Sequence, residues 1–195
     1  NSYEVGYQDK LLVSRNELLV VGKHNIENLL AALTLGYQFG LPIKEMIKAA
    51  KTFKGLPHRL EFITSINHVD FYNDSKSTNA VSTKTAVNSL LEKYSQLVLI
   101  LGGIAKQENY SELIELINEK VETVVLIGDS SKVFSEQLSV PTLKIARSME
   151  EAVGLSKSLT KNGAVVLSPA CASFDMFDDF NDRGDQFKHH VNEGS

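Results

Sequence analysis

Short apolar runs alternate with helical patterns through most of the chain after residue 95. The runs are four or five residues long, as in buried strands, and lie at residues 97–101, 123–127, 142–145 and 164–167. Apolar residues recur at helical spacing between them, over residues 110–121, 131–138 and 149–160. Strands that alternate with helices in this way pair in parallel through right-handed crossovers. The pattern predicts an α/β fold with a doubly wound, mostly parallel sheet and helices on both faces.

The segments on either side of this series extend the same sheet. Residues 60–64 and 69–72 are typical of a hairpin closed around Asn67, and residues 78–94 of a helix. After the last strand, small residues lead into an acidic and aromatic stretch. This stretch predicts a final helix with Ser173 as its N-cap and Asp175 in its first turn.

The first 54 residues have a different pattern. Residues 10–14 and 17–21 alternate as two short strands, which predicts a hairpin. A helix from an N-cap at Asn25 to a stop at Gly40 follows, then a shorter helix over residues 43–53. Glycine and proline at residues 55–57 then break the chain. We therefore expect two domains, at residues 1–54 and 55–195.

Composition narrows the classes of function. The 195 residues carry a formal charge of −4, which gives no electrostatic footprint for nucleic acid or an anionic membrane. The single cysteine excludes an internal disulfide framework and fits a reducing compartment. With apolar runs too short for a bilayer and no signal peptide, the sequence predicts a cytoplasmic protein. The chain begins at Asn1 without a methionine, which predicts a piece of something longer.

Three strand ends carry unusual polar loops, where doubly wound sheets bind ligands. In the first, Asp74 could accept from ribose hydroxyls, Lys76 could face an anion, and Thr78 could hold an anion at a helix start. In the second, two glycines allow close approach of a ligand and Lys106 supplies a charge. The third contains Ser173. Each has a structural alternative: a capped polar turn, an exposed lysine or a simple helix cap.

Other polar residues are weaker candidates. His58 and Arg59 follow the break and could meet a phosphate, although basic residues are common in linkers. Asn28, about one turn into its helix, could bind a planar ring or simply cap. Histidines, cysteine and carboxylates nowhere have metal-ligand spacing, so we predict no metal site. Cys171 has no convincing histidine partner and is expected to be inert.

Five motifs in a fixed order resemble the ATP-dependent Mur ligases of peptidoglycan synthesis, and the last is similar to that of the members that add D-glutamate. The motifs are GKHNIEN, GLPHRLE, NDSKSTN, LGGIAK and LSPACASFDMFDDFNDRG. The resemblance covers most of the chain. It implies that residues 1–54 end a central ATP-binding domain and that residues 55–195 form a Rossmann-like C-terminal domain.

The resemblance also implies a reaction. ATP, with Mg²⁺, phosphorylates the carboxylate of UDP-N-acetylmuramoyl-L-alanine, and the amine of D-glutamate attacks the acyl phosphate to form an amide. By similarity, Thr78 and Lys106 hold one carboxylate of D-glutamate, and Ser173 and the backbone at Phe180 hold the other. The nucleotide contacts implied by similarity are Asn28, Arg59 and Asp74. Lys76 and His58 lie in the same motifs as possible catalytic support.

The departures from the family limit what this chain can do alone. It contains no GxxxxGK[ST] sequence, so the family's phosphate-binding loop is absent from these residues, as are its uridine-binding domain and magnesium ligands. We therefore expect the fragment to be inactive without the N-terminal and central domains. Two alternatives stay open: another Mur or folylpolyglutamate synthase-like ligase, and a non-catalytic Rossmann-like binding domain.

Overall fold

The computed structural model describes residues 4–7 and 10–193, which form two compact units divided between Gly55 and Leu56. The first unit contains four elements and a 3₁₀ turn: β1 (Glu4–Tyr7), β2 (Lys10–Ser14), η1 (Arg15–Glu17), α1 (Lys23–Gln38) and α2 (Ile43–Thr52). The second contains β3 (Glu61–Ile66), β4 (Val69–Asn73), α3 (Ala80–Leu91), β5 (Leu97–Gly102), α4 (Ser111–Lys120), β6 (Thr123–Ile127), α5 (Ser131–Gln137), β7 (Thr142–Ile145), α6 (Met149–Leu159), β8 (Gly163–Leu167) and α7 (Phe180–Asn192).

The hairpin of the first unit lies one strand earlier than predicted. β2 pairs antiparallel with β1, not with residues 17–21, which are not a strand. The backbone N–H of Ser14 donates to the carboxylate of Glu17 over 3.0 Å, and the chain turns away in η1. Because of this local capping contact, the chain forms a turn here, and the apolar run that follows does not form the strand that its alternating pattern predicted.

The predicted cap of α1 is also wrong by a few residues. The N-cap is Gly22, which has φ of 95°, a conformation that suits glycine. Asn25 lies inside the first turn, and its side-chain amide donates to the carbonyl of Val21 over 2.7 Å. The predicted stop is confirmed, because Gly40 follows the helix with φ of 76°.

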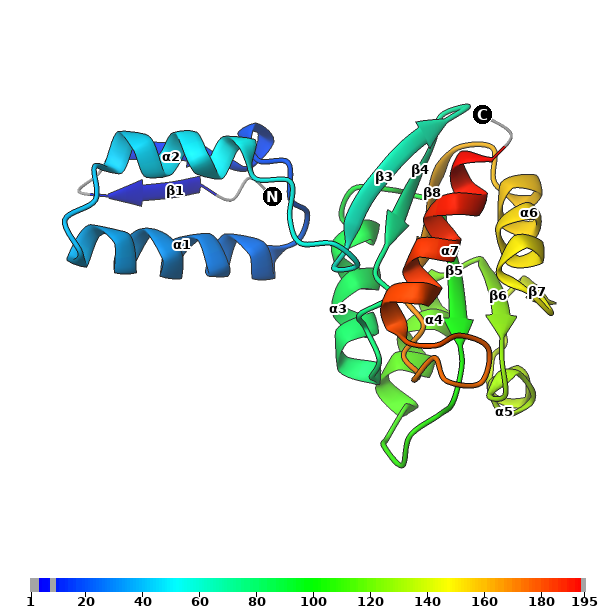
Figure 1. Ribbon diagram of the computed structural model, residues 1–195. Coiled ribbons are helices and arrows are strands. Elements are labelled where there is room, and N and C mark those ends of the chain that lie inside the picture. The colour runs from blue at the N-terminus through cyan, green and yellow to red at the C-terminus, as the bar shows by residue number, and fades with distance from the viewer. Residues whose placement is uncertain (1–3, 8–9, 194–195) are drawn as a thin grey trace. The chain divides into compact units, whose positions relative to one another are not determined.

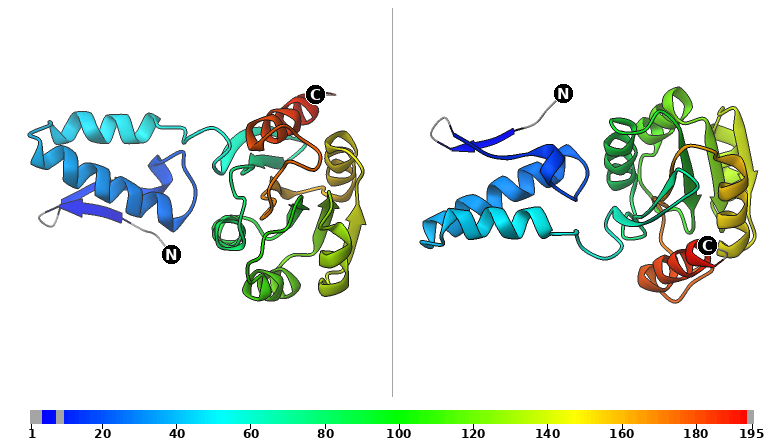
Figure 2. Two further views of the ribbon diagram at one scale, coloured as in Figure 1. Left: turned by 60° about the horizontal axis from the view of Figure 1, so that its bottom comes forward. Right: turned by 90° about the horizontal axis from the view of Figure 1, so that it is seen from above.

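The second unit has a six-stranded sheet in the order β3-β4-β8-β5-β6-β7, in which only β3 and β4 are antiparallel (Figure 1). α6 and α7 pack on one face, and α3 and α4 on the other, as the two views of Figure 2 show. The predicted doubly wound α/β fold is confirmed. The predicted hairpin is confirmed too, since Asn67 and His68 both have positive φ, the signature of a tight two-residue turn.

Helices on both faces explain why the central strands are apolar throughout. Every residue of β5, β6 and β8 is buried, as expected when neither face of a sheet meets solvent. On the face of α6 and α7, alternate strand residues meet the helices in one apolar cluster, which includes Phe71, Ile100, Val165, Met149 and Phe187. This core holds the strand ends at fixed heights, which positions the loops that follow them.

The last helix begins later than predicted. α7 starts at Phe180, and the Asp179 side chain caps it by accepting from the amides of Asn181 and Asp182 at 2.7 and 2.8 Å. Ser173 is therefore not a helix N-cap. Its carbonyl accepts from the amides of Met176 and Phe177, which closes one isolated turn within the loop between β8 and α7.

Among residues 4–7 and 10–193, no helix combines the length and the apolar character that crossing a membrane would require.

A candidate anion site at three strand ends

Three loops leave the sheet from adjacent strands. In the register of the sheet, Asn73 of β4 and Ile100 of β5 both pair with Leu167 of β8, so the three strands end at nearly the same height. Their carboxyl ends point the same way because the strands are parallel. The loops at residues 73–79, 102–106 and 168–179 therefore emerge side by side. The sequence predicted this for residues 73–79, 102–106 and 168–173.

The loops after β5 and β8 are joined by backbone hydrogen bonds. Gly102 donates to the carbonyl of Pro169 over 2.9 Å, and Ile104 and Ala172 form a two-way bridge. A Cβ at Gly102 would lie 2.0 Å from the carbonyl oxygen of Ile127. The glycines, which we expected to admit a ligand, thus serve close packing of backbone on backbone.

Thr78 and Lys106 are brought into contact. The ammonium of Lys106 donates to the hydroxyl of Thr78 over 3.2 Å, joining the β4 loop to the β5 loop. Lys106 is exposed and Thr78 half-buried, so an anion could reach both groups. The structure thus pairs the two residues that similarity assigns to a single carboxylate.

Ser173 is the most unusual polar residue of the site. The side chain is 1% exposed, and its hydroxyl has no hydrogen-bond partner among the described residues. In the same loop, the equally buried Ser168 donates to Asp74 over 2.7 Å. Because buried hydroxyl groups nearly always have a hydrogen-bond partner, the unpartnered hydroxyl of Ser173 indicates a place where a ligand could bind.

Asp74 does not face solvent as a ribose contact would. It is 3% exposed, and its two carboxylate oxygens accept from the amide of Leu60 and the hydroxyl of Ser168. Burial raises the pKa of Asp74 from 3.8 to about 6, although the hydrogen bonds oppose the shift. A ribose could reach this carboxylate only by displacing one of those donors.

We expect Asp74 to give stability a distinctive pH dependence. Because its pKa is raised on folding, its contribution to the free energy of unfolding is fullest below pH 3.8 and is lost as the pH rises through about 6. About two pKa units correspond to roughly 3 kcal/mol. Urea titrations from pH 4 to 7.5 should therefore show Asp74→Asn gaining stability relative to wild type across that interval. Parallel pH curves for the two proteins would contradict the assignment.

His58 and Lys76 both pack against the start of α7. The ring of His58 is 7% exposed and accepts at Nδ1 from the side-chain amide of Asn73 over 3.0 Å, with Phe180 edge-on beside it. Burial lowers the pKa of His58, which agrees with a neutral ring. Lys76 is exposed, with its ammonium 5.2 Å from the centre of the Phe180 ring. Both residues therefore help to place α7.

Arg59 and Asn28 are exposed in their respective units, so each side chain is open to a ligand. Cys171 is fully buried, and burial raises the pKa of its thiol. A thiol in that state is a weak nucleophile.

Sequence reasoning missed Arg183, which the structure places between two of the loops that form the candidate site. Its guanidinium is 0% exposed and donates to the loops after both β4 and β8. The sequence offered one signal, an arginine between two aspartates at the start of a helix, but such a pattern is typical of an exposed face.

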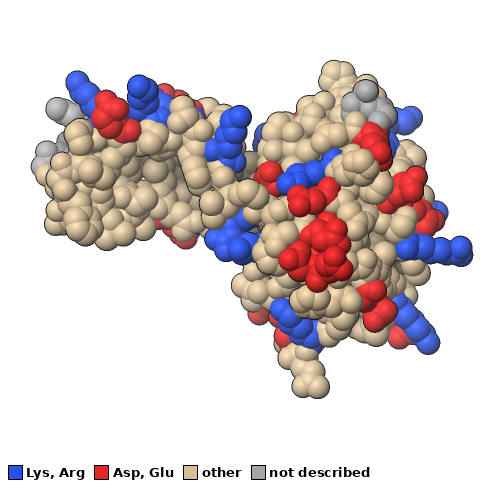
Figure 3. Space-filling view, viewed as in Figure 1, with Lys and Arg blue, Asp and Glu red and all other residues tan. Residues whose placement is uncertain are grey.

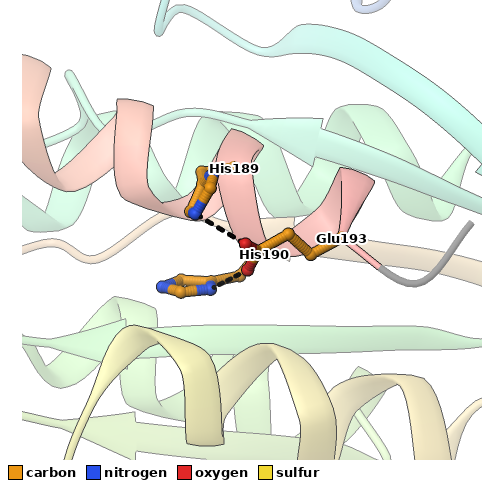
Figure 4. A group of neighbouring side chains, drawn as sticks. All are labelled: His189, His190 and Glu193. Carbon is orange, nitrogen blue, oxygen red and sulfur yellow. Dashed lines mark hydrogen bonds and ion pairs between the residues drawn. The ribbon is translucent and has the colours of Figure 1, made fainter.

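One described group of side chains has the geometry of metal ligands, at the far end of α7. Glu193 pairs with His189 at 2.9 Å and with His190 at 3.0 Å, as Figure 4 shows. Two of the three side chains are exposed, and each of the three already has a partner within the group. We assign no metal to them.

Comparison with known sequences identifies the family. A family model described as "Mur ligase, glutamate ligase domain" matches residues 58–171, which contain the loops after β4 and β5 and the beginning of the third. The chain belongs to the Mur ligase family, whose members are ATP-dependent ligases that use Mg²⁺.

Within the family, the relatives at higher identity are named UDP-N-acetylmuramoylalanine--D-glutamate ligase. The protein of Marinobacter nauticus is 44% identical over 186 residues, covering 94% of this chain and 41% of the relative. That of Cytophaga hutchinsonii is 46% identical over 178 residues, covering 90% of this chain and 39% of the relative. The chain therefore spans about two fifths of the length of these relatives.

Solved structures agree on the fold. A MurF structure from Acinetobacter baumannii has a TM-score of 0.67 at 18% identity, covering 88% of this chain and 38% of that one. A folylpolyglutamate synthase from Thermotoga maritima has a TM-score of 0.64 at 19% identity, covering 91% and 41%. These likenesses concern the fold alone.

Proposed function

We propose that this chain is the D-glutamate-binding part of an ATP-dependent ligase that joins D-glutamate to UDP-N-acetylmuramoyl-L-alanine in peptidoglycan synthesis. The observation that carries the proposal is the buried hydroxyl of Ser173, which has no partner among the described residues and lies in the loop beside the paired Thr78 and Lys106. The names of the relatives support the choice of substrate.

The donors suit a molecule with two carboxylates. On one side, the Thr78 hydroxyl and the Lys106 ammonium form a charged pair of donors for one carboxylate. On the other, the Ser173 hydroxyl is free to donate. The first-turn amides of Asn181 and Asp182 are used by the Asp179 cap, which leaves the Phe180 amide as a further donor at the start of α7.

Held at both ends, D-glutamate presents its amine in a fixed direction. ATP supplies the activation, as an acyl phosphate on the muramoyl-alanine carboxylate. The amine nitrogen attacks the acyl carbon, the carbon–oxygen bond to phosphate breaks, phosphate leaves with the electron pair and the nitrogen loses a proton. The contribution of this chain is orientation, which converts binding of the carboxylates into a faster attack.

The nucleotide contacts are proposed for Asn28, Arg59 and Asp74, with different support. The side chains of Asn28 and Arg59 are exposed, whereas Asp74 is buried and already hydrogen-bonded. The phosphate-binding loop and the magnesium ligands belong to the part of the family's sequence that these residues do not include. No step of phosphate activation is therefore assigned to side chains of this chain.

We also propose that residues 1–54 end the central ATP-binding domain. The core of this unit is small, with Val5, Val13 and Ile26 as its buried centre. Many apolar side chains stay exposed on it, namely Leu19, Leu30, Leu35, Tyr37, Phe39, Leu41 and Phe53. An apolar surface of this kind is expected where more of the same domain packs.

The test compares amino acids on the full-length protein. Phosphate release with ATP and UDP-N-acetylmuramoyl-L-alanine should depend on D-glutamate, and L-glutamate, glycine and diaminopimelate should give little. In NMR titrations of this chain, D-glutamate should shift the amides of Thr78, Ser173 and Phe180 more than L-glutamate does. Dependence on a diamino acid would reject the choice of substrate, and an absence of ATP-dependent ligation would favour a binding domain.

A further inference from the structure

Arg183 is a buried cation in the first half of α7. Acidic side chains gather over this helix in Figure 3. Of its own acidic residues, Asp182 is half-buried and Asp185 is exposed. Arg183 points the other way and is among the largest fully buried side chains. Lys188 forms an ion pair with Asp185, and the side-chain amide of Gln186 donates to Asp182. These two carboxylates therefore have partners other than Arg183.

The guanidinium joins the two loops on which the candidate site depends. Its Nε donates to the hydroxyl of Ser75 over 2.9 Å, and its Nη2 donates to the carbonyl of the same residue over 2.8 Å. Its Nη1 donates to the carbonyl of Cys171 over 3.1 Å. The Ser75 hydroxyl in turn donates to the carbonyl of Phe180 over 2.8 Å. One planar group thus connects the β4 loop, the β8 loop and the start of α7.

We propose that Arg183 is the positioning residue that sets the separation of the two carboxylate-binding sides. Ser75 lies three residues before Thr78, and Cys171 lies two before Ser173. The distance between the two sides determines the length of dicarboxylate that fits. The inference deepens the proposed function and rests on it, because it assumes that these loops hold D-glutamate.

Packing alone does not explain an arginine at this position. All three described acceptors of the guanidinium are neutral: two carbonyls and a hydroxyl. Burial disfavours the charged form, but the nearby Asp175 carboxylate opposes the shift, so the pKa falls only to about 10 and Arg183 is charged at neutral pH. An apolar side chain of similar volume would fill the same space without this cost. What arginine adds is three donors in a rigid plane.

Arg183→Lys in the full-length ligase is the test. Lysine keeps the charge but reaches the acceptors from a single nitrogen, so the connection between the loops loosens. We expect the KM for D-glutamate to rise about tenfold, with the KM values for ATP and UDP-N-acetylmuramoyl-L-alanine changed less than about twofold. The preference for D-glutamate over D-aspartate and D-2-aminoadipate, which are one methylene shorter and longer, should fall in kcat/KM.

Two further variants keep the test decisive. Ser75→Ala removes the Nε contact and the link to Phe180 but keeps both carbonyl contacts, so the same loss of length selectivity should be smaller. Arg147→Lys makes the same exchange on an exposed residue and should change nothing. If Arg183→Lys does not fold, Ser75→Ala decides.

The outcomes separate this inference from the proposed function. A wild-type protein that does not use D-glutamate removes the proposed function. A wild-type D-glutamate ligase in which Arg183→Lys raises all three KM values equally, or lowers thermal stability with length selectivity intact, overturns the positioning role alone. A selective loss on D-glutamate together with relaxed length preference supports it.

Discussion

Ser173→Ala is expected to raise the KM for D-glutamate in the full-length ligase by about 10- to 100-fold. That range corresponds to the roughly 1.5–3 kcal/mol that a hydrogen bond to a charged group contributes. The folded protein should not lose stability, because the hydroxyl makes no hydrogen bond to the described residues. Steady-state kinetics and thermal unfolding of the same variant measure the two effects.

Ser168→Ala is the matched contrast for stability. It removes a hydroxyl of equal burial from the same loop, but this hydroxyl donates to Asp74 over 2.7 Å. Its loss should lower the free energy of unfolding by about 1–3 kcal/mol, because the buried carboxylate of Asp74 loses one of its donors. If Ser173→Ala destabilises the chain as much as Ser168→Ala, the Ser173 hydroxyl has a structural partner and the ligand argument fails.

The position of the site followed from the sequence because it depends on topology. Alternating strands and helices require parallel pairing, and parallel pairing brings the carboxyl ends of neighbouring strands to one edge. Local patterns therefore sufficed to expect that loops 73–79, 102–106 and 168–173 meet. The contact between Lys106 and Thr78, 28 residues apart, is a consequence of that edge.

The hydrogen bonds within the candidate site could not be predicted from the sequence, because they depend on which polar groups are buried. Ser173 and Asp179 are both good helix caps, and only the course of the loop decides that Asp179 caps α7. Aspartate and arginine are usually found at the surface. Nevertheless Asp74 and Arg183 are both buried, and each contacts a residue about a hundred positions away. Such pairings leave no periodic signal.

The role of the two glycines in the second loop could not be predicted from the sequence either. A pair of glycines permits close approach, but the sequence does not say to what. In the structure, Gly102 approaches the backbone of β6 and Gly103 the carbonyl of Ala172. Backbone contacts with the neighbouring segments thus hold the loop in place. Contact with a ligand would come from the side chains that follow the glycines.

Gly102→Ala should accordingly be among the most destabilising single changes in the chain. Its φ of 129° is strained for any residue with a Cβ, and the added atom would lie 2.0 Å from the carbonyl oxygen of Ile127. Backbone strain and overpacking each cost about 1–3 kcal/mol, so we expect a loss near 4 kcal/mol, a large share of a typical 5–15 kcal/mol. Urea-induced unfolding of this chain measures the change.

Gly154→Ala is the control, since this glycine lies within α6 and a Cβ there would meet nothing within 4 Å. The same substitution should raise the free energy of unfolding by up to about 1 kcal/mol, because alanine favours helix over glycine. Opposite signs for the two variants follow directly from the geometry around each Cα. A Gly102→Ala protein as stable as wild type would mean that the β5 loop can move away from β6, and that the edge of the sheet does not hold the site rigidly.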